Sequence, residues 1–167
     1  WEEIRPPLLP LLFSPFSLNK QYIFYAELIL FFITLACVCA LYALTKRLFN
    51  QTIAGLSALL LTVNSVFILE SIQFHTAILA LFFMLLSLYL LIRTDLKHPY
   101  FLAGFTAALA FLARFPSGLL YPAIIAMVLM NLHRKEQQTW SEKKEAIFKI
   151  TLGFLIPLFI FAIINIT

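Results

Sequence analysis

Residues 22–44 read YIFYAELILFFITLACVCALYAL, an apolar run that one acidic residue, Glu27, interrupts near its beginning. A helix needs about 20 apolar residues to cross the roughly 30 Å of hydrocarbon in a bilayer, because every backbone N–H and C=O must be bonded within the segment. The run is long enough, and the polar triplet Thr45-Lys46-Arg47 closes it. This stretch therefore predicts a transmembrane helix.

Further apolar runs follow along the chain. The segment 100–132 is too long for one span, and residues 114–118 (RFPSG) break it near the middle. We therefore predict two short helices there, with a re-entrant hairpin as the alternative. The last run is expected to be broken or kinked at Pro157. Together the runs predict about six spans, at residues 22–44, 53–69, 76–92, two within 100–132, and 146–166.

Composition agrees with a membrane protein. The chain is 62% hydrophobic and 12% charged, whereas soluble domains are roughly 45–50% apolar and 25% charged. The net charge of +4 does not indicate a nucleic-acid partner, because the basic residues flank apolar runs and form no separate patch. We predict an all-α transmembrane bundle that forms one domain over residues 1–167, in contact with membrane lipids.

Lysine and arginine are distributed unevenly between the two sides of this layout. Positive charge is retained on the cytoplasmic side of a membrane. Three basic residues, Arg5, Lys20 and Arg114, fall on one side. The other nine of the 12 fall on the opposite side: Lys46, Arg47, Arg93, Lys97, Arg134, Lys135, Lys143, Lys144 and Lys149. The larger set predicts the cytoplasmic face and places both ends of the chain outside.

The first residues predict an outer segment. The chain begins Trp1-Glu2-Glu3, without an initiating Met or a secretory signal, so we expect a fragment of a longer protein. Residues 6–16 are apolar but too short to span and contain several prolines, so they are expected to lie along the membrane surface. Residues 1–21 are therefore predicted to form an outer loop, and residues 22–166 to form the spans. A different feature, the small residues of 103–110 (AGFTAALA), predicts close helix packing.

Polar residues at the outer ends of the spans are the candidates for function. An arginine at such a place, Arg5 or Arg114, either extends to the interface as an anchor or binds a phosphate with its forked guanidinium. His75 is either a general base or an interfacial residue that is hydrogen-bonded. Glu70 is expected to end a helix, and Glu27 to reach the interface or to pair with a partner.

No metal site is predicted from the sequence. The three histidines, His75, His98 and His133, are too far apart in the sequence to suggest a ligand cluster. Cys37 and Cys39 point to different faces of one helix, which makes a disulfide or a zinc pair improbable. No cofactor is evident, and the sequence leaves dependence on a divalent metal open.

Three stretches resemble elements of a known family. Residues 41–50 (LYALTKRLFN) with 54–61 (AGLSALLL) look like a helix, a short Arg-Leu-Phe-Gly turn and an Ala/Leu-rich helix. Residues 109–120 (LAFLARFPSGLL) are similar to a Leu-Thr-Lys-x-Pro-x-Gly-Leu-Leu stretch, with Arg114 in place of the lysine. Residues 3–8 (EIRPPL) look like a Lys-Pro-Pro-Leu element, with Arg5 in place of the lysine. In order and spacing the chain resembles the GT-C integral-membrane glycosyltransferases, which include protein O-mannosyltransferases, aminoarabinose transferases and Rgt-like transferases.

The resemblance implies transfer of a sugar from a polyprenyl-phosphate-linked donor to a glycan, lipid or protein acceptor on the outer face. Arg5 and Arg114 would bind the lipid phosphate and stabilise it as a leaving group. The base would be an aspartate that follows the family's first span. That span is not in this sequence, so the chain alone is expected to be inactive.

One position departs from the family pattern. The family commonly has an acid before the third span, where this chain has the possible catalytic residue His75, which leaves a second carboxylate and any metal-binding role in question. The competing hypothesis is a transporter or flippase subunit whose substrate path is lined by Glu27, His75 and Arg114. That hypothesis requires polar residues at mid-membrane and discontinuous helices.

Overall fold

The computed structural model describes residues 8, 22–72, 75–93, 96–130 and 139–166, and the regular structure in these ranges is entirely helical. The apolar runs form helices because a backbone in an apolar medium must satisfy its own hydrogen bonds. The order of the elements is α2 (Tyr22–Leu48), α3 (Gln51–Val63), α4 (Ser65–Ile72), α5 (Thr76–Ile92), α6 (Pro99–Ala113), the 3₁₀ helix η2 (Phe115–Leu119), α7 (Leu120–Leu129) and α8 (Trp140–Ile166).

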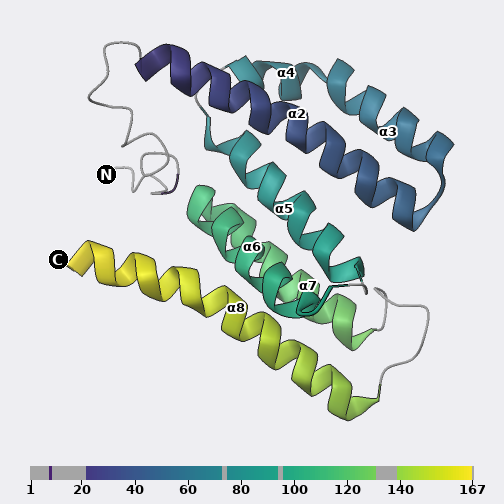
Figure 1. Cartoon of the computed structure of the whole chain (residues 1–167), viewed down its shortest axis with the longest axis vertical. Helices are drawn as coiled ribbons and strands as arrows, with labels where there is room; N and C mark the ends of the chain where they lie inside the picture. Colours follow the sequence, from purple (N-terminus) through teal and green to yellow (C-terminus); the bar gives the residue numbers. More distant parts are fainter. Residues whose placement is uncertain (1–7, 9–21, 73–74, 94–95, 131–138, 167) are drawn as a thin grey trace.

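The helices lie side by side. Helix α2 packs against α3 on one side and α5 on the other, α5 packs against α6, and α6 packs against α8. Figure 1 shows α2 and α3 at one side of the molecule and α8 at the other, with α5, α6 and α7 between them. Helix α6 therefore lies inside the bundle.

Glycines allow α6 and α8 to cross closely. A Cβ atom on Gly104 of α6 would lie 2.1 Å from the carbonyl oxygen of Ile150 in α8. In return, a Cβ on Gly153 of α8 would lie 2.2 Å from the carbonyl oxygen of Phe101 in α6. Each helix thus presents a glycine to the other's backbone. This contact confirms the small-residue packing face predicted for residues 103–110, of which Ala103, Gly104, Ala107, Ala108 and Ala110 are buried.

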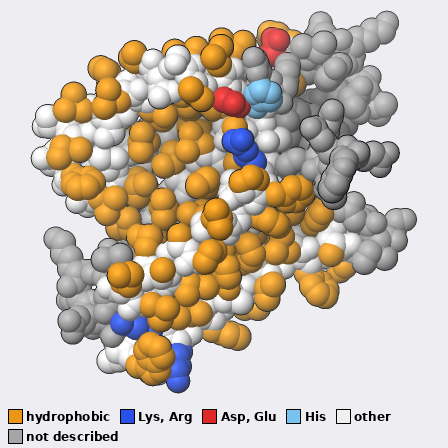
Figure 2. All heavy atoms as spheres, turned by 180° about the vertical axis from the view of Figure 1, so that it is seen from behind, with side chains coloured by type: hydrophobic (Ala, Val, Ile, Leu, Met, Phe, Trp, Pro, Cys, Tyr) orange, Lys and Arg blue, Asp and Glu red, His pale blue; other side chains and the backbone are white. Residues whose placement is uncertain are grey.

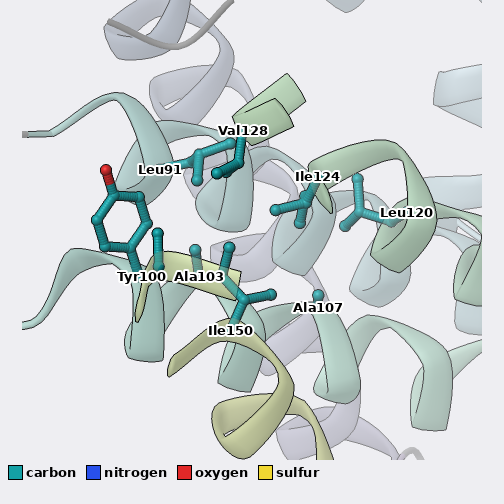
Figure 3. Close-up of a cluster of buried hydrophobic side chains, with 9 residues drawn as sticks. Leu91, Tyr100, Ala103, Ala107, Leu120, Ile124, Val128 and Ile150 are labelled. Carbon is teal, nitrogen blue, oxygen red and sulfur yellow. The ribbon is translucent and has the colours of Figure 1, made fainter. Parts of the chain in front are cut away.

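The main buried cluster joins α5, α6, α7 and α8. Figure 3 shows side chains of all four helices meeting there. The cluster consists of Leu91, Tyr100, Ala103, Ala107, Leu120, Ile124, Val128, Ala146 and Ile150. Association of helices in lipid depends on close van der Waals packing and on hydrogen bonds between helices. This cluster therefore holds α5, α6, α7 and α8 together.

Side-chain hydrogen bonds connect neighbouring helices. Ser87 Oγ in α5 donates to the carbonyl oxygen of Ala103 in α6 at 2.7 Å. The hydroxyls of Tyr121 in α7 and Thr151 in α8 lie 2.9 Å apart. Cys37 Sγ in α2 lies 3.5 Å from the carbonyl oxygen of Ile78 in α5, while Cys39 is exposed and both cysteines are free.

By length and composition, two of the described helices can cross a membrane, at Phe24–Leu48 and Trp140–Ile163. A third span exists if α3 and α4 count as one, although they are bent by 60° at their junction. The remaining apolar helices have 10–17 residues. The structure thus shows two or three candidate spans, against about six predicted.

Two of the predicted spans differ internally from the structure. The segment 53–69, predicted as one span, is interrupted at Asn64, where α3 ends and α4 begins. Conversely, α8 is continuous through Pro157, so of the predicted break or kink at this proline the break is wrong. Helices packed inside a membrane protein tolerate proline because their surroundings satisfy the freed backbone groups, and Pro157 is buried.

Basic residues from different loops meet at one end of the bundle. Arg47, at the end of α2, and Arg93, which follows α5, lie over the ring of Tyr89 at 5.3 and 5.9 Å. Lys143 Nζ, near the beginning of α8, donates to the carbonyl oxygen of Leu129 at the end of α7. Charge counting assigned these loops to one side of the membrane. In the α2–α5 pair and in the α7–α8 pair, they lie next to each other.

Candidate functional site

A cleft of about 340 Å³ opens between three walls of the bundle. One wall is the junction of α3 and α4, the second is the first half of α5, and the third is the corner between α6 and η2. Four polar residues line it, namely Asn64, Glu70, Arg114 and Ser117, among eight apolar ones. Figure 2 shows acidic, basic and histidine side chains close together on an otherwise largely apolar face.

Arg114 stands at the corner where α6 ends. Its backbone is extended (φ −155°, ψ 116°), and its N–H donates to the carbonyl oxygen of Ala110 at 2.9 Å, which completes the last turn of α6. Pro116 disfavours an α-helical conformation of the residue before it, Phe115, which begins the 3₁₀ helix η2. The exposed Arg114 side chain has no ion-pair or hydrogen-bond partner among the described residues. The guanidinium is therefore available to a ligand in the cleft.

The 3₁₀ helix η2 places Ser117 in the same cleft. The Ser117 N–H donates to the Arg114 carbonyl oxygen at 2.9 Å, and the Ser117 side chain is buried. Gly118 then packs against an aromatic ring, since a Cβ there would lie 2.7 Å from Phe111 Cδ2. This close contact fixes the position of η2 against α6.

Glu70, which lines this cleft, is paired with His75. His75 Nδ1 lies 3.0 Å from Glu70 Oε2, and the two side chains are 52% and 31% exposed. Glu70 lies in the last turns of α4, and His75 is the residue before α5, so the short connection between these helices brings them together. When Nδ1 carries the ring proton and donates a hydrogen bond to Glu70, Nε2 can accept another proton.

Asn64 also lines the cleft and lies at the break between α3 and α4. Its backbone is extended (φ −66°, ψ 119°), and its side-chain oxygen accepts the N–H of Phe67 at 3.0 Å. An asparagine that caps the next helix in this way stabilises a new helix start. The 60° bend then turns α4, and with it Glu70, toward the cleft.

The other predicted residues are placed apart from this cleft or outside the described ranges. Glu27 lines a different cleft, of about 280 Å³, with residues of α2 and α4. Arg5 and the predicted surface segment 6–16, apart from Leu8, lie outside the described residues. Within the described ranges no group of three or more His, Cys, Asp and Glu side chains could hold a metal ion.

Three residues of the cleft were not predicted to be functional: Asn64, Glu70 and Ser117. Glu70 could have been recognised, because an acid five residues before His75 across a helix break is within reach of it. Ser117 lies within the RFPSG stretch, three residues after Arg114. Asn64 gives little signal, since a single asparagine in an apolar run does not by itself indicate a break.

The arrangement can bind an anion on one side and accept a proton on the other. Arg114 is a fork of donors suited to phosphate or carboxylate, and the Glu70–His75 pair offers an imidazole nitrogen. A search among curated proteins and one among solved structures found no match. A family model described as dolichyl-phosphate-mannose-protein mannosyltransferase matches residues 5–164.

Proposed function

Because the chain belongs to the dolichyl-phosphate-mannose-protein mannosyltransferase family, we propose that it transfers a sugar from a polyprenyl-phosphate carrier to an acceptor on the outer face of the membrane. Membership assigns the chain to integral-membrane glycosyltransferases of the mannosyltransferase type. The carrier, the acceptor side and the roles of individual residues are our proposals. The observation that carries them is a cleft lined by Arg114, which has no partner among the described residues, and by Glu70, which is paired with His75.

In this proposal Arg114 binds the carrier phosphate, together with Arg5. During transfer the bond between sugar C1 and the phosphate oxygen breaks, while C1 forms a bond to the acceptor oxygen. Negative charge builds up on the departing phosphate, and a cation in a site of low dielectric stabilises that charge more in the transition state than before it.

The acceptor proton goes to His75 in this proposal. Nε2 takes the proton from the attacking hydroxyl, and the Glu70 carboxylate at 3.0 Å orients the ring and stabilises the imidazolium that forms. Glu70 is then a positioning residue. The other candidate for the base is the aspartate that the family resemblance implies.

The proposed topology keeps about six membrane passes. The bent pair α3–α4 forms one pass, and the short helices α5, α6 and η2–α7 pass between the longer α2 and α8. Both ends of the chain then lie on the outer face, with the Arg114 cleft. In this topology the bilayer thins locally to match the shorter helices.

The test is release of carrier phosphate by the full-length protein in membrane vesicles supplied with polyprenyl-phosphate mannose. We expect Arg114→Ala to lower kcat about 100-fold, because removal of one group that stabilises transition-state charge has an effect of this size. Arg114→Lys should retain most of the activity. Lys97→Ala, an exposed cation in the loop before α6, is the matched control. Full activity of Arg114→Ala would refute the proposed role of Arg114.

One observation favours a second candidate, a transporter or flippase subunit. Helices α3 and α4 are discontinuous and their junction lines the cleft, as in transporter binding sites. Proteoliposomes containing a fluorescent polyprenyl-phosphate sugar separate the two candidates. Movement of the lipid between leaflets without release of carrier phosphate would identify a flippase, whereas release without movement supports the transferase.

A further inference from the structure

Ser117 is a buried hydroxyl without a partner in the described part of the chain. Four polar side chains there are buried, namely Thr45, Ser87, Thr106 and Ser117. Ser87 donates to the carbonyl oxygen of Ala103, and Thr106 bonds to two carbonyl oxygens of its own helix. Thr45 and Ser117, each 7% exposed, have no side-chain hydrogen bond to any described residue. A buried polar group without a bond is costly, so such a group calls for an explanation.

The two unbonded hydroxyls differ in where they lie. Ser117 lines the cleft that also contains Arg114, whereas Thr45, at the other end of the bundle in the last turns of α2, lines none of the described clefts. Only the Ser117 hydroxyl of this pair can therefore be satisfied by a ligand that enters the cleft.

The geometry of η2 places Ser117 beside Arg114. Arg114 is the residue just before η2 and has an extended backbone, and the Ser117 N–H bond to the Arg114 carbonyl oxygen closes the turn between them. Both residues line the same cleft. The packing of Gly118 against Phe111 holds η2 in place there.

We propose that Ser117 is a binding residue for the phosphate group of a polyprenyl-phosphate ligand, with its hydroxyl donating to an oxygen that Arg114 also holds. This inference rests on the proposed function. A phosphate oxygen that accepts from a guanidinium retains a lone pair for a second donor, and charge-assisted bonds of this kind are the stronger ones.

The Glu70 carboxylate in the same cleft has a partner of its own. Glu70 lies on α4, and His75 Nδ1 is 3.0 Å from its carboxylate. Because this carboxylate is paired with His75, Arg114 and Ser117 keep their donors for the ligand. The volume of about 340 Å³ is within the range of small-molecule sites, roughly 300–1,000 Å³.

The experiment measures binding of a short-chain polyprenyl monophosphate to the full-length protein in detergent. We expect Ser117→Ala to weaken binding about tenfold, since one hydrogen bond to a charged group is lost. Thr45→Val, which removes the other unbonded buried hydroxyl, should leave the affinity unchanged. The corresponding polyprenol, which has no phosphate, should bind weakly and equally to all variants.

The outcomes separate this inference from the proposed function. If Arg114→Ala weakens binding and Ser117→Ala does not, the role of Ser117 is refuted while the phosphate site at Arg114 stands. If neither variant changes the affinity, both are refuted. Tight binding of the polyprenol would also overturn the phosphate site. Displacement by phosphatidylglycerol or inorganic phosphate at equal concentration would overturn the assignment of the ligand as a polyprenyl carrier.

Discussion

Gly118 allows η2 to pack closely against α6 because it has no side chain. A Cβ there would lie 2.7 Å from Phe111 Cδ2 and 3.1 Å from Phe111 Cε2, and the ring is itself packed near Phe115 and Phe154. We expect Gly118→Ala to destabilise the protein by about 1–2 kcal/mol through overpacking. Thermal unfolding in detergent measures this effect.

The control for this substitution is Gly55, in the middle of α3. No atom lies within 4 Å of a Cβ placed there, and alanine is the better helix former. Gly55→Ala is therefore expected to leave the unfolding temperature unchanged or to raise it slightly. Equal unfolding temperatures of the Gly118 and Gly55 variants would show that Phe111 yields freely.

Among single residues, the sequence predicted those whose chemistry is unusual in a membrane. Arg114 and His75 were chosen as candidates because a charge or an imidazole beside an apolar run needs an explanation. Ser117 and Asn64 were not, since small polar residues are common within membrane helices and their role depends on a cleft that forms only when three helices pack. Arg5 and its proposed role stay a prediction from the sequence.

At the scale of elements, the break between α3 and α4 depends on one side chain. Asn64 Oδ1 accepts the Phe67 N–H at 3.0 Å, and we expect Asn64→Ala to cost about 1 kcal/mol of stability. Because Asn64 also lines the cleft, the variant should reduce transfer activity beyond this loss. Parallel measurements of unfolding temperature and carrier-phosphate release test both effects.

Asn50 provides the matched comparison. It caps α3 in the same way, with Oδ1 accepting the Ile53 N–H at 2.8 Å, but it is not among the cleft residues. Asn50→Ala should therefore lose a similar amount of stability and keep its activity. A similar loss of activity in the two variants would show that stability alone, and not the shape of the cleft, is responsible.

The crossing of α6 and α8 depends on two glycines that act as a pair. A Cβ on Gly104 would meet backbone atoms of Ile150 and one on Gly153 backbone atoms of Phe101, and backbone cannot move aside as a side chain can. We expect Gly104→Ala to cost about 3 kcal/mol, at the upper end for overpacking. Unfolding in detergent should show a large loss.

The double variant shows whether the two contacts are coupled. Once one alanine has pushed the helices apart, the second should add little, so the combined cost should be clearly less than the sum of the two single costs. Additive costs would mean that the two contacts yield independently and that the helices are not rigid bodies at this crossing.

Most helix boundaries could be predicted from the sequence, because charges and prolines end apolar runs. The starts of α5 at Thr76 and α6 at Pro99 follow directly from such signals. The interruption at Asn64 and the continuity at Pro157 could not be predicted, since both depend on how neighbouring helices satisfy the backbone. The predicted small-residue face on α6 was confirmed, but its partner α8 is known only from the structure.

At the scale of the whole molecule, the orientation in the membrane is the prediction to test. Charge counting places the loop with Lys97 in the cytoplasm and the end of α4 outside. In a variant without Cys37 and Cys39, a cysteine at Lys97→Cys should react with a membrane-impermeant maleimide only in inverted vesicles. A cysteine at Ile72→Cys, at the end of α4, should react only in right-side-out vesicles.

The reverse labelling pattern would mean that the Arg114 cleft opens toward the cytoplasm. Labelling of both positions from the same side would mean that α5 does not cross the membrane. Each result would contradict the proposed position of the acceptor on the outer face, because α5 connects the end of α4 to the Lys97 loop.

The central position of α6 also has a consequence for biosynthesis. Helix α6 packs against α8 through Gly104 and Gly153, yet the ribosome makes α8 only after α7 and residues 130–139. During that interval the glycine face of α6 lacks its partner from this chain. The rate of translation over this stretch therefore sets how long the partly assembled bundle exists before α8 is made.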